Sequence, residues 1–137
     1  MTHTALALLG FAGWTIVLVL VLLGYRAPLM LFGGRAPNSF SATGADVSPF
    51  GQRIVRAHAN CVENLPVAGA VLLFAIASGH TDVTEALALP FLGARVAQSC
   101  VHLTSTSNAA VSVRFTFFAV QLAIVAWWMV GLVRELS

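Results

Sequence analysis

The sequence predicts an all-α integral membrane protein folded as a four-helix bundle, and two observations lead to this prediction. Hydrophobic residues make up 58% of the 137-residue chain, whereas Asp, Glu, Lys and Arg together make up 9%. A soluble domain needs about a quarter of its residues charged to cover its surface. In addition, four long apolar segments are each long enough to cross a bilayer. We therefore expect residues 1–137 to form a single transmembrane domain.

The predicted helices cover about residues 4–25, 50–79, 83–103 and 109–133. The first carries no charge, and at about 1.5 Å per residue it spans a hydrocarbon core of roughly 30 Å. No basic residue precedes it, so we expect a retained helix rather than a cleaved signal peptide. The second is polar in its first turns and apolar from Leu65 onward, and the third contains Glu85 and Arg95. In the fourth, Arg114 is the only charged residue.

The connections between these segments predict how the helices run. Residues 26–48 contain Gly33-Gly34 and Pro37-Asn38, which are typical of a loop, while the other two connections are short. Neighbouring helices should therefore be antiparallel. Arginines flank the first and third loops, and the positive-inside rule then places these loops in the cytoplasm and both termini outside. The arginines concerned are Arg26, Arg35, Arg53, Arg56 and Arg114.

Polar residues form a stripe on each of the last three helices. At about 100° per residue, the members of each stripe share one helical face. Because the second and fourth helices begin at the predicted cytoplasmic side and the third ends there, we expect the stripes to converge in that half of the bundle. The stripes consist of Arg53, Arg56, Asn60, Glu63 and Asn64 on the second helix, Arg95, Gln98, Ser99 and His102 on the third, and Arg114 and Gln121 on the fourth.

The charge of this polar cluster indicates a ligand. Its four arginines face a single acid, Glu63. Burying an unpaired charge in a membrane is costly, so a dry core would not tolerate this excess. We expect water or an anionic ligand there. The alternative is internal pairing, in which Glu63 neutralises Arg56 or Arg95 and the amides satisfy the remaining polar groups.

Other classes of function receive little support. A formal charge of +2 with no Lys argues against a nucleic-acid partner. Cys61 and Cys100 lack the spacing of a metal or redox pair, so we expect no metal site. His58 and His102 lie at similar depth and raise the possibility of a bis-histidine haem carrier, but Arg and Glu side chains occupy the same depth.

A family resemblance adds to this interpretation. The run from Arg56 to Pro66, RAHANCVENLP, resembles the second-helix signature of the MAPEG family, the membrane-associated proteins of eicosanoid and glutathione metabolism. Gly93-Ala94-Arg95-Val96 and the arginine before Phe117-Phe118 extend the resemblance over about residues 50–125. The resemblance implies a homotrimer, similar to microsomal glutathione transferases, that holds glutathione between subunits at the cytoplasmic side. A lipophilic second substrate would then arrive from the membrane lipids.

The resemblance also implies roles for individual residues. Arg114 matches the arginine that stabilises the glutathione thiolate, and Arg26 matches another charged contact. Glutathione carries two carboxylates and one amine, which several arginines and one glutamate complement. The chain departs from the eicosanoid-forming members where His102 and Phe118 replace tyrosines. The expected glutathione-binding set is Arg26, Arg53, Arg56, Asn60, Glu63, Asn64, Arg95, Gln98 and His102.

The expected function is therefore a glutathione-dependent transferase or peroxidase that acts on a hydrophobic electrophile or a lipid peroxide. Because the family also contains non-catalytic members, the fold alone does not decide activity. The alternative function is a non-enzymatic protein that binds a lipid or presents it to a partner.

Overall fold

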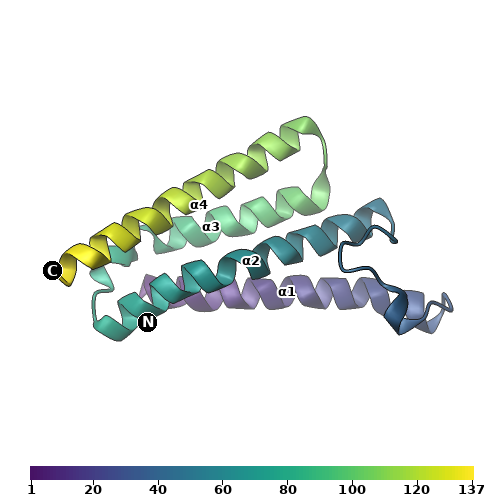
Figure 1. The fold of residues 1–137 in the computed structure, drawn as a ribbon, viewed down its shortest axis with the longest axis horizontal. Coiled ribbons are helices and arrows are strands. Elements are labelled where there is room, and N and C mark those ends of the chain that lie inside the picture. Colours follow the sequence, from purple (N-terminus) through teal and green to yellow (C-terminus); the bar gives the residue numbers. More distant parts are fainter.

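The computed structural model describes residues 1–137, and its secondary structure is entirely helical. Four long helices follow one another, α1 (His3–Leu31), α2 (Pro49–Ser78), α3 (Asp82–Thr104) and α4 (Asn108–Glu135), with a short 3-10 turn at Pro37–Ser39. Each of the four is long and apolar enough to cross a membrane. Successive helices run antiparallel, so both termini lie at the same end of the bundle (Figure 1). The predicted all-helical architecture is confirmed.

Local sequence explains where the helices begin and end. The Ser48 hydroxyl accepts a hydrogen bond from the backbone of Gly51 at the start of α2, and Ser107 caps α4 in the same way through Ala110. Pro49 occupies the first turn of α2, where no backbone donor is needed. Gly79 ends this helix with a φ of 79°, a left-handed conformation that glycine adopts without strain.

The first helix is longer than predicted. We expected it to end at Tyr25, with a loop from Arg26 onward, but α1 continues through Pro28 to Leu31. The charge of Arg26 marks the edge of the apolar segment rather than the end of the helix. Its guanidinium donates to the Ser41 carbonyl at 3.3 Å and lies 5.0 Å from the centre of the Phe40 ring, so the charge turns toward the loop.

Aromatic side chains from three helices form the centre of the apolar core. The rings of Phe11 and Phe91 meet edge to face at 5.9 Å, and Phe91 also packs against Trp128 at 5.3 Å. All three side chains are almost completely buried. The outward-facing residues are also largely Leu, Val, Phe and Trp, as expected where the surrounding solvent is lipid.

Helix α3 is central to the packing. It contacts α1, α2 and α4, whereas α2 and α4 touch each other at few points. The line along which α2 and α4 face each other is therefore loosely filled. We call it the α2–α4 seam, and Val67, Val71, Leu122 and Leu132 line cavities along it.

The loop between α1 and α2 is held by one ion pair. The Arg35 guanidinium pairs with the Asp46 carboxylate, donates to the Asp46 carbonyl at 3.0 Å and stacks over Phe40 at 4.3 Å. Asp46 also accepts a hydrogen bond from the Ser41 backbone at 3.0 Å. Although burial acts to raise it, the pKa of Asp46 is lowered by backbone hydrogen bonds and by the Arg35 charge.

At the opposite end, Thr4 ties α1 to α3. Its hydroxyl lies 2.7 Å from the Thr84 hydroxyl and donates to the Glu85 carboxylate at 2.9 Å. The same carboxylate accepts from the backbone of Thr4 at 3.1 Å and of His3 at 2.7 Å. Since the first amides of a helix have no partner within it, Glu85 satisfies donors that would otherwise remain free.

We predict that Thr4→Val lowers the free energy of unfolding by about 1–2 kcal/mol, because it removes a buried hydroxyl that hydrogen-bonds to α3. Thermal or denaturant unfolding in detergent micelles measures the effect. The matched control is Thr116→Val, since the Thr116 hydroxyl is exposed and bonds only within its own helix. Equal stability of the two variants would contradict the proposed role of Thr4.

We also predict that the loop between α1 and α2 loosens in acid. Because the pKa of folded Asp46 lies below its ordinary value of 3.8, the ionised carboxylate stabilises the loop above that pH. This contribution is lost as the pH falls below 3.8 through the folded-state pKa. Amide hydrogen exchange of the Ser41 backbone should therefore accelerate over this range, after correction for intrinsic exchange. In Asp46→Asn, exchange should already be fast at neutral pH and should show no such transition.

Candidate functional site

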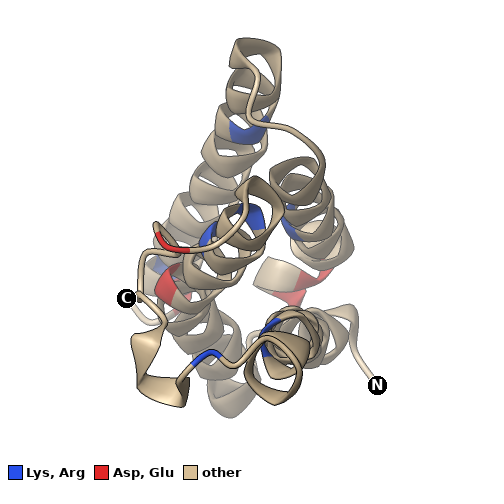
Figure 2. Cartoon of the chain, turned by 90° about the vertical axis from the view of Figure 1, so that its right-hand side faces the viewer, with Lys and Arg blue, Asp and Glu red and all other residues tan.

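Arginines gather at the end of the bundle opposite the termini. We call this the arginine-rich end, defined by Arg26, Arg35, Arg53, Arg56 and Arg114. Here α1 and α3 end while α2 and α4 begin, as the antiparallel topology requires. Figure 2 looks along the bundle from this end, and basic positions are visible on several helices. The polar stripes of α2, α3 and α4 start here and continue toward the middle of the bundle.

A buried arginine joins α2 to α3. The Arg95 side chain is 1% exposed, and its Nη1 donates to Asn60 Oδ1 at 2.6 Å. Asn64 donates from its side-chain amide to the Asn60 backbone carbonyl at 2.7 Å. The Arg95 guanidinium carbon lies 5.1 Å from the centre of the Phe11 ring, and the face of this ring attracts the cation. Because Arg95 occupies Oδ1 of Asn60, the amide hydrogens of Asn60 are directed away from it.

A second contact joins α4 to α3. Arg114 Nη1 lies 3.0 Å from Nδ1 of His102. A guanidinium has donors only, so Nδ1 must be the acceptor in this contact. His102 is then a neutral ring whose proton is on Nε2, and that N–H can donate to a ligand. The pair therefore presents hydrogen-bond donors from both residues.

Two further contacts extend the cluster. Gln121 on α4 donates to Oε1 of Gln98 at 3.0 Å, and both side chains are buried. Nearer the arginine-rich end, Arg53 Nε donates to the Leu103 carbonyl at 2.9 Å. That carbonyl belongs to the last turn of α3, where the helix dipole favours a cation. Members of all three predicted stripes are thus in contact through α3.

Arg56 and Glu63 occupy a different environment. Both are exposed on the outer surface of α2, and neither forms a hydrogen bond within the chain. The two ion pairs of the structure are His3–Glu85 and Arg35–Asp46. The alternative in which Glu63 neutralises Arg56 or Arg95 within one chain is therefore wrong, because no ion pair joins Glu63 to either arginine.

Arg26 also lies apart from the hydrogen-bonded cluster. Its contacts are with Ser41 and Phe40 of the loop between α1 and α2. The sequence placed this arginine at the end of α1, but several further residues of the helix follow it. Any contact of Arg26 with a ligand of the cluster would require that ligand to extend toward the loop.

The net charge of the cluster is positive. Arg95 and Arg114 contact the neutral side chains of Asn60 and His102, and Arg56 is exposed on α2. None of them has a carboxylate partner in the chain. An anion placed among these side chains would gain charge-assisted hydrogen bonds without displacing an existing ion pair. The arrangement therefore suits a ligand that carries carboxylates.

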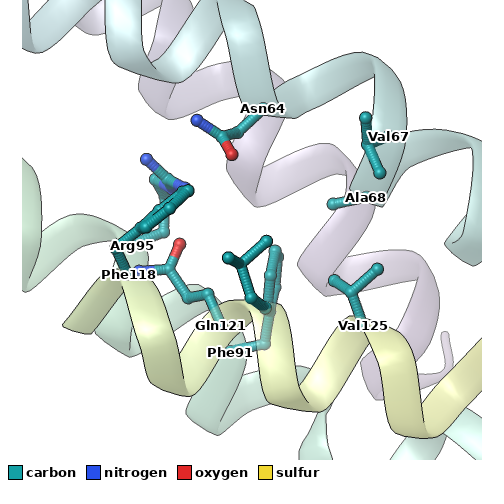
Figure 3. Close-up of a pocket in the computed structure, with 9 residues that line it drawn as sticks. Asn64, Val67, Ala68, Phe91, Arg95, Phe118, Gln121 and Val125 are labelled. Carbon is teal, nitrogen blue, oxygen red and sulfur yellow. The ribbon is translucent and has the colours of Figure 1, made fainter. Parts of the chain in front are cut away.

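A small cavity continues from this cluster along the α2–α4 seam. Its volume is about 20 Å³. Figure 3 shows polar Asn64, Arg95 and Gln121 toward one side of it, with Val67, Ala68 and Val125 toward the other. The sequence placed Gln121 on the Arg114 face but not in the glutathione-binding set. Its apolar lining residues carried no sequence signal, because such side chains line most transmembrane helices. They are Val67, Ala68, Phe91, Phe118, Leu122 and Val125.

Comparison with known proteins identifies the family. No curated protein and no solved structure matches the chain significantly. The sequence pattern that defines the MAPEG family matches residues 4–134, which is nearly the whole chain, and this agrees with the resemblance of the Arg56–Pro66 run. Together with four helices that can cross a membrane, the match indicates an integral multi-pass membrane protein. The chain belongs to the MAPEG family.

Proposed function

We propose that this protein is a membrane-embedded glutathione-dependent transferase or peroxidase whose second substrate is a hydrophobic electrophile or a lipid peroxide. The observation that carries the proposal is the group of arginines without an acidic partner at the α2, α3 and α4 contacts. Glutathione supplies two carboxylates to such a group, while its amine suits the outward-facing Glu63. Membership of the MAPEG family is consistent with this activity.

In the proposed mechanism, Arg114 acts on the sulfur. A guanidinium beside a thiol favours the thiolate, because opposite charges stabilise the ionised form. The neutral His102 ring holds the Arg114 side chain in place through Nδ1. In conjugation the thiolate forms a carbon–sulfur bond while a bond of the attacked carbon breaks. The electron pair of that bond leaves with the departing group, or stays on the product and takes up a proton. In peroxide reduction the thiolate attacks the terminal oxygen and the O–O bond breaks, so that the lipid leaves as an alcohol with the inner oxygen. A second glutathione then attacks the oxidised sulfur, forms the disulfide and releases the attacked oxygen as water.

The proposal includes an assembly and an orientation. Exposed Arg56 and Glu63 lie two helical turns apart on α2, so each could meet the opposite charge on another copy of the chain. We propose a homotrimer in which glutathione binds between copies. The arginine-rich end would face the cytoplasm, in accordance with the positive-inside rule, and both termini would face outward.

A second candidate function is lipid binding without catalysis. The second, wholly apolar cavity along the α2–α4 seam favours it, because a site with this lining can hold part of an acyl chain. In that case the arginines would hold an anionic headgroup. The two functions differ in whether any thiol-dependent turnover exists.

We predict that glutathione binds the detergent-purified protein and that Arg56→Ala and Glu63→Gln each weaken binding at least about tenfold, because each removes a charged partner of the ligand. Isothermal titration calorimetry measures the effect. Arg134→Ala, at the opposite end of the bundle, is the matched control and should bind as the wild type does. A glutathione analogue without the thiol should retain most of the affinity. No binding at millimolar glutathione would exclude the transferase function and favour the lipid-binding one.

We predict that Arg114→Ala lowers kcat by a factor of about 10²–10³, as expected when one preorganised donor to a developing or stabilised anion is removed. Glutathione affinity should fall much less. Turnover of a hydrophobic electrophile and the ultraviolet absorbance of the thiolate should decrease together, and Arg114→Lys should restore part of both. Unchanged thiolate formation in Arg114→Ala would contradict the role assigned to this residue.

A further inference from the structure

Two buried polar atoms of the cavity on the α2–α4 seam have no partner in the chain. They are Nε of Arg95, which can only donate, and Oε1 of Gln121, which can only accept. Their residues are 1% and 2% exposed, respectively, and both line the same cavity. The side-chain amide of Gln121 donates through Nε2 to Oε1 of Gln98 and to the Phe117 carbonyl. Buried polar groups almost always have a hydrogen-bond partner, so we expect the cavity to hold a molecule that bonds to these two atoms.

The chemistry of the two atoms defines the partner. It must accept a hydrogen bond from Arg95 and donate one to Gln121. A carboxylate fails the second condition, because its lone pairs would face the lone pairs of Gln121 Oε1. An ammonium group fails the first condition and would also be repelled by the guanidinium. A hydroxyl group satisfies both, and so does a water molecule.

The surroundings of the cavity indicate where such a hydroxyl group comes from. Most of the lining is apolar, and Leu122 at its edge is 49% exposed. Farther along the same seam lies a second cavity of about 180 Å³, formed by apolar residues only. An apolar chain attached to the hydroxyl can therefore lie between α2 and α4. Residues of the second cavity are Val71, Phe74, Met129, Leu132, Val133 and Leu136.

We propose that the α2–α4 seam binds a single-chain amphiphile with a terminal hydroxyl, whose oxygen accepts from Arg95 Nε and donates to Gln121 Oε1 while its chain follows the seam. Figure 3 shows the Gln121 oxygen directed into the space beside Arg95 and Asn64. The proposal deepens the lipid-binding function proposed for this seam and rests on it, and it shares Arg95 with the proposed glutathione site. The hydroxyl uses Nε of Arg95, whereas Nη1 is bonded to Asn60.

The test compares three probes of equal chain length with the detergent-purified protein in the absence of glutathione. They are 1-decanol, the ether 1-methoxydecane, which accepts but cannot donate, and sodium decanoate. Because a ligand of the folded state raises the unfolding midpoint, saturating 1-decanol should raise it by on the order of 5 °C. The ether and the carboxylate should produce little specific shift. Circular dichroism follows the transition.

Two variants test the position of the site. Leu122→Trp fills the edge of the cavity and should remove the shift caused by 1-decanol. Its matched control is Val120→Trp, because Val120 is 45% exposed on the same helix but does not line the cavity, and the shift should persist there. Gln121→Met removes the acceptor, so 1-decanol should no longer raise the unfolding midpoint more than the ether does.

Three results would overturn the proposal. Equal shifts from 1-decanol and the ether in the wild type would show that the hydroxyl hydrogen is not recognised. A shift that persists in Leu122→Trp would place the binding elsewhere, for example in the micelle. No shift from 1-decanol would mean that the cavity holds water only. Should Gln121→Met fail to fold, the comparison of Leu122→Trp with Val120→Trp still decides the question.

Discussion

The structure depends on a buried cation that has no anion beside it. Arg95 lies in the middle of an apolar bundle, where an uncompensated charge is costly. Asn60 and the Phe11 ring offset part of this cost through a hydrogen bond and an aromatic face. They are neutral, so the net positive charge remains. The polar groups around Arg95 consequently form a site that is complete only when a ligand, water or another subunit supplies further acceptors.

The same arginine organises the helices around it. Through Asn60 it joins α3 to α2, and one turn farther along α3 the Gln98 amide joins α4. Polar contacts of this kind bring helices together in lipid, where apolar surface has no preference for protein over hydrocarbon. Because α2 and α4 are both held by α3 rather than by each other, the seam between them stays open. The packing thus explains both the charged cluster and the cavity beside it.

Much of the fold could be predicted from the sequence, since the number and order of the helices follow from hydropathy. The end of α1 was missed, because the charge of Arg26 marks the limit of the apolar segment while the backbone hydrogen bonds continue to Leu31. For the site, helical spacing predicted the polar stripes on α2, α3 and α4. It could not predict that Glu63 faces outward while Arg95 faces inward, which depends on how the helices are rotated in the bundle. The free Gln121 oxygen likewise results from tertiary packing.

The central claim is that the excess positive charge of the cluster is matched by the carboxylates of its ligand. The most direct test measures the thermal unfolding midpoint of the purified protein with glutathione and with glutathione dimethyl ester, in which both carboxylates are masked and the thiol is retained. The account predicts that glutathione raises the midpoint in a concentration-dependent manner and that the ester has little effect at the same concentrations. Equal stabilisation by the two compounds would contradict it.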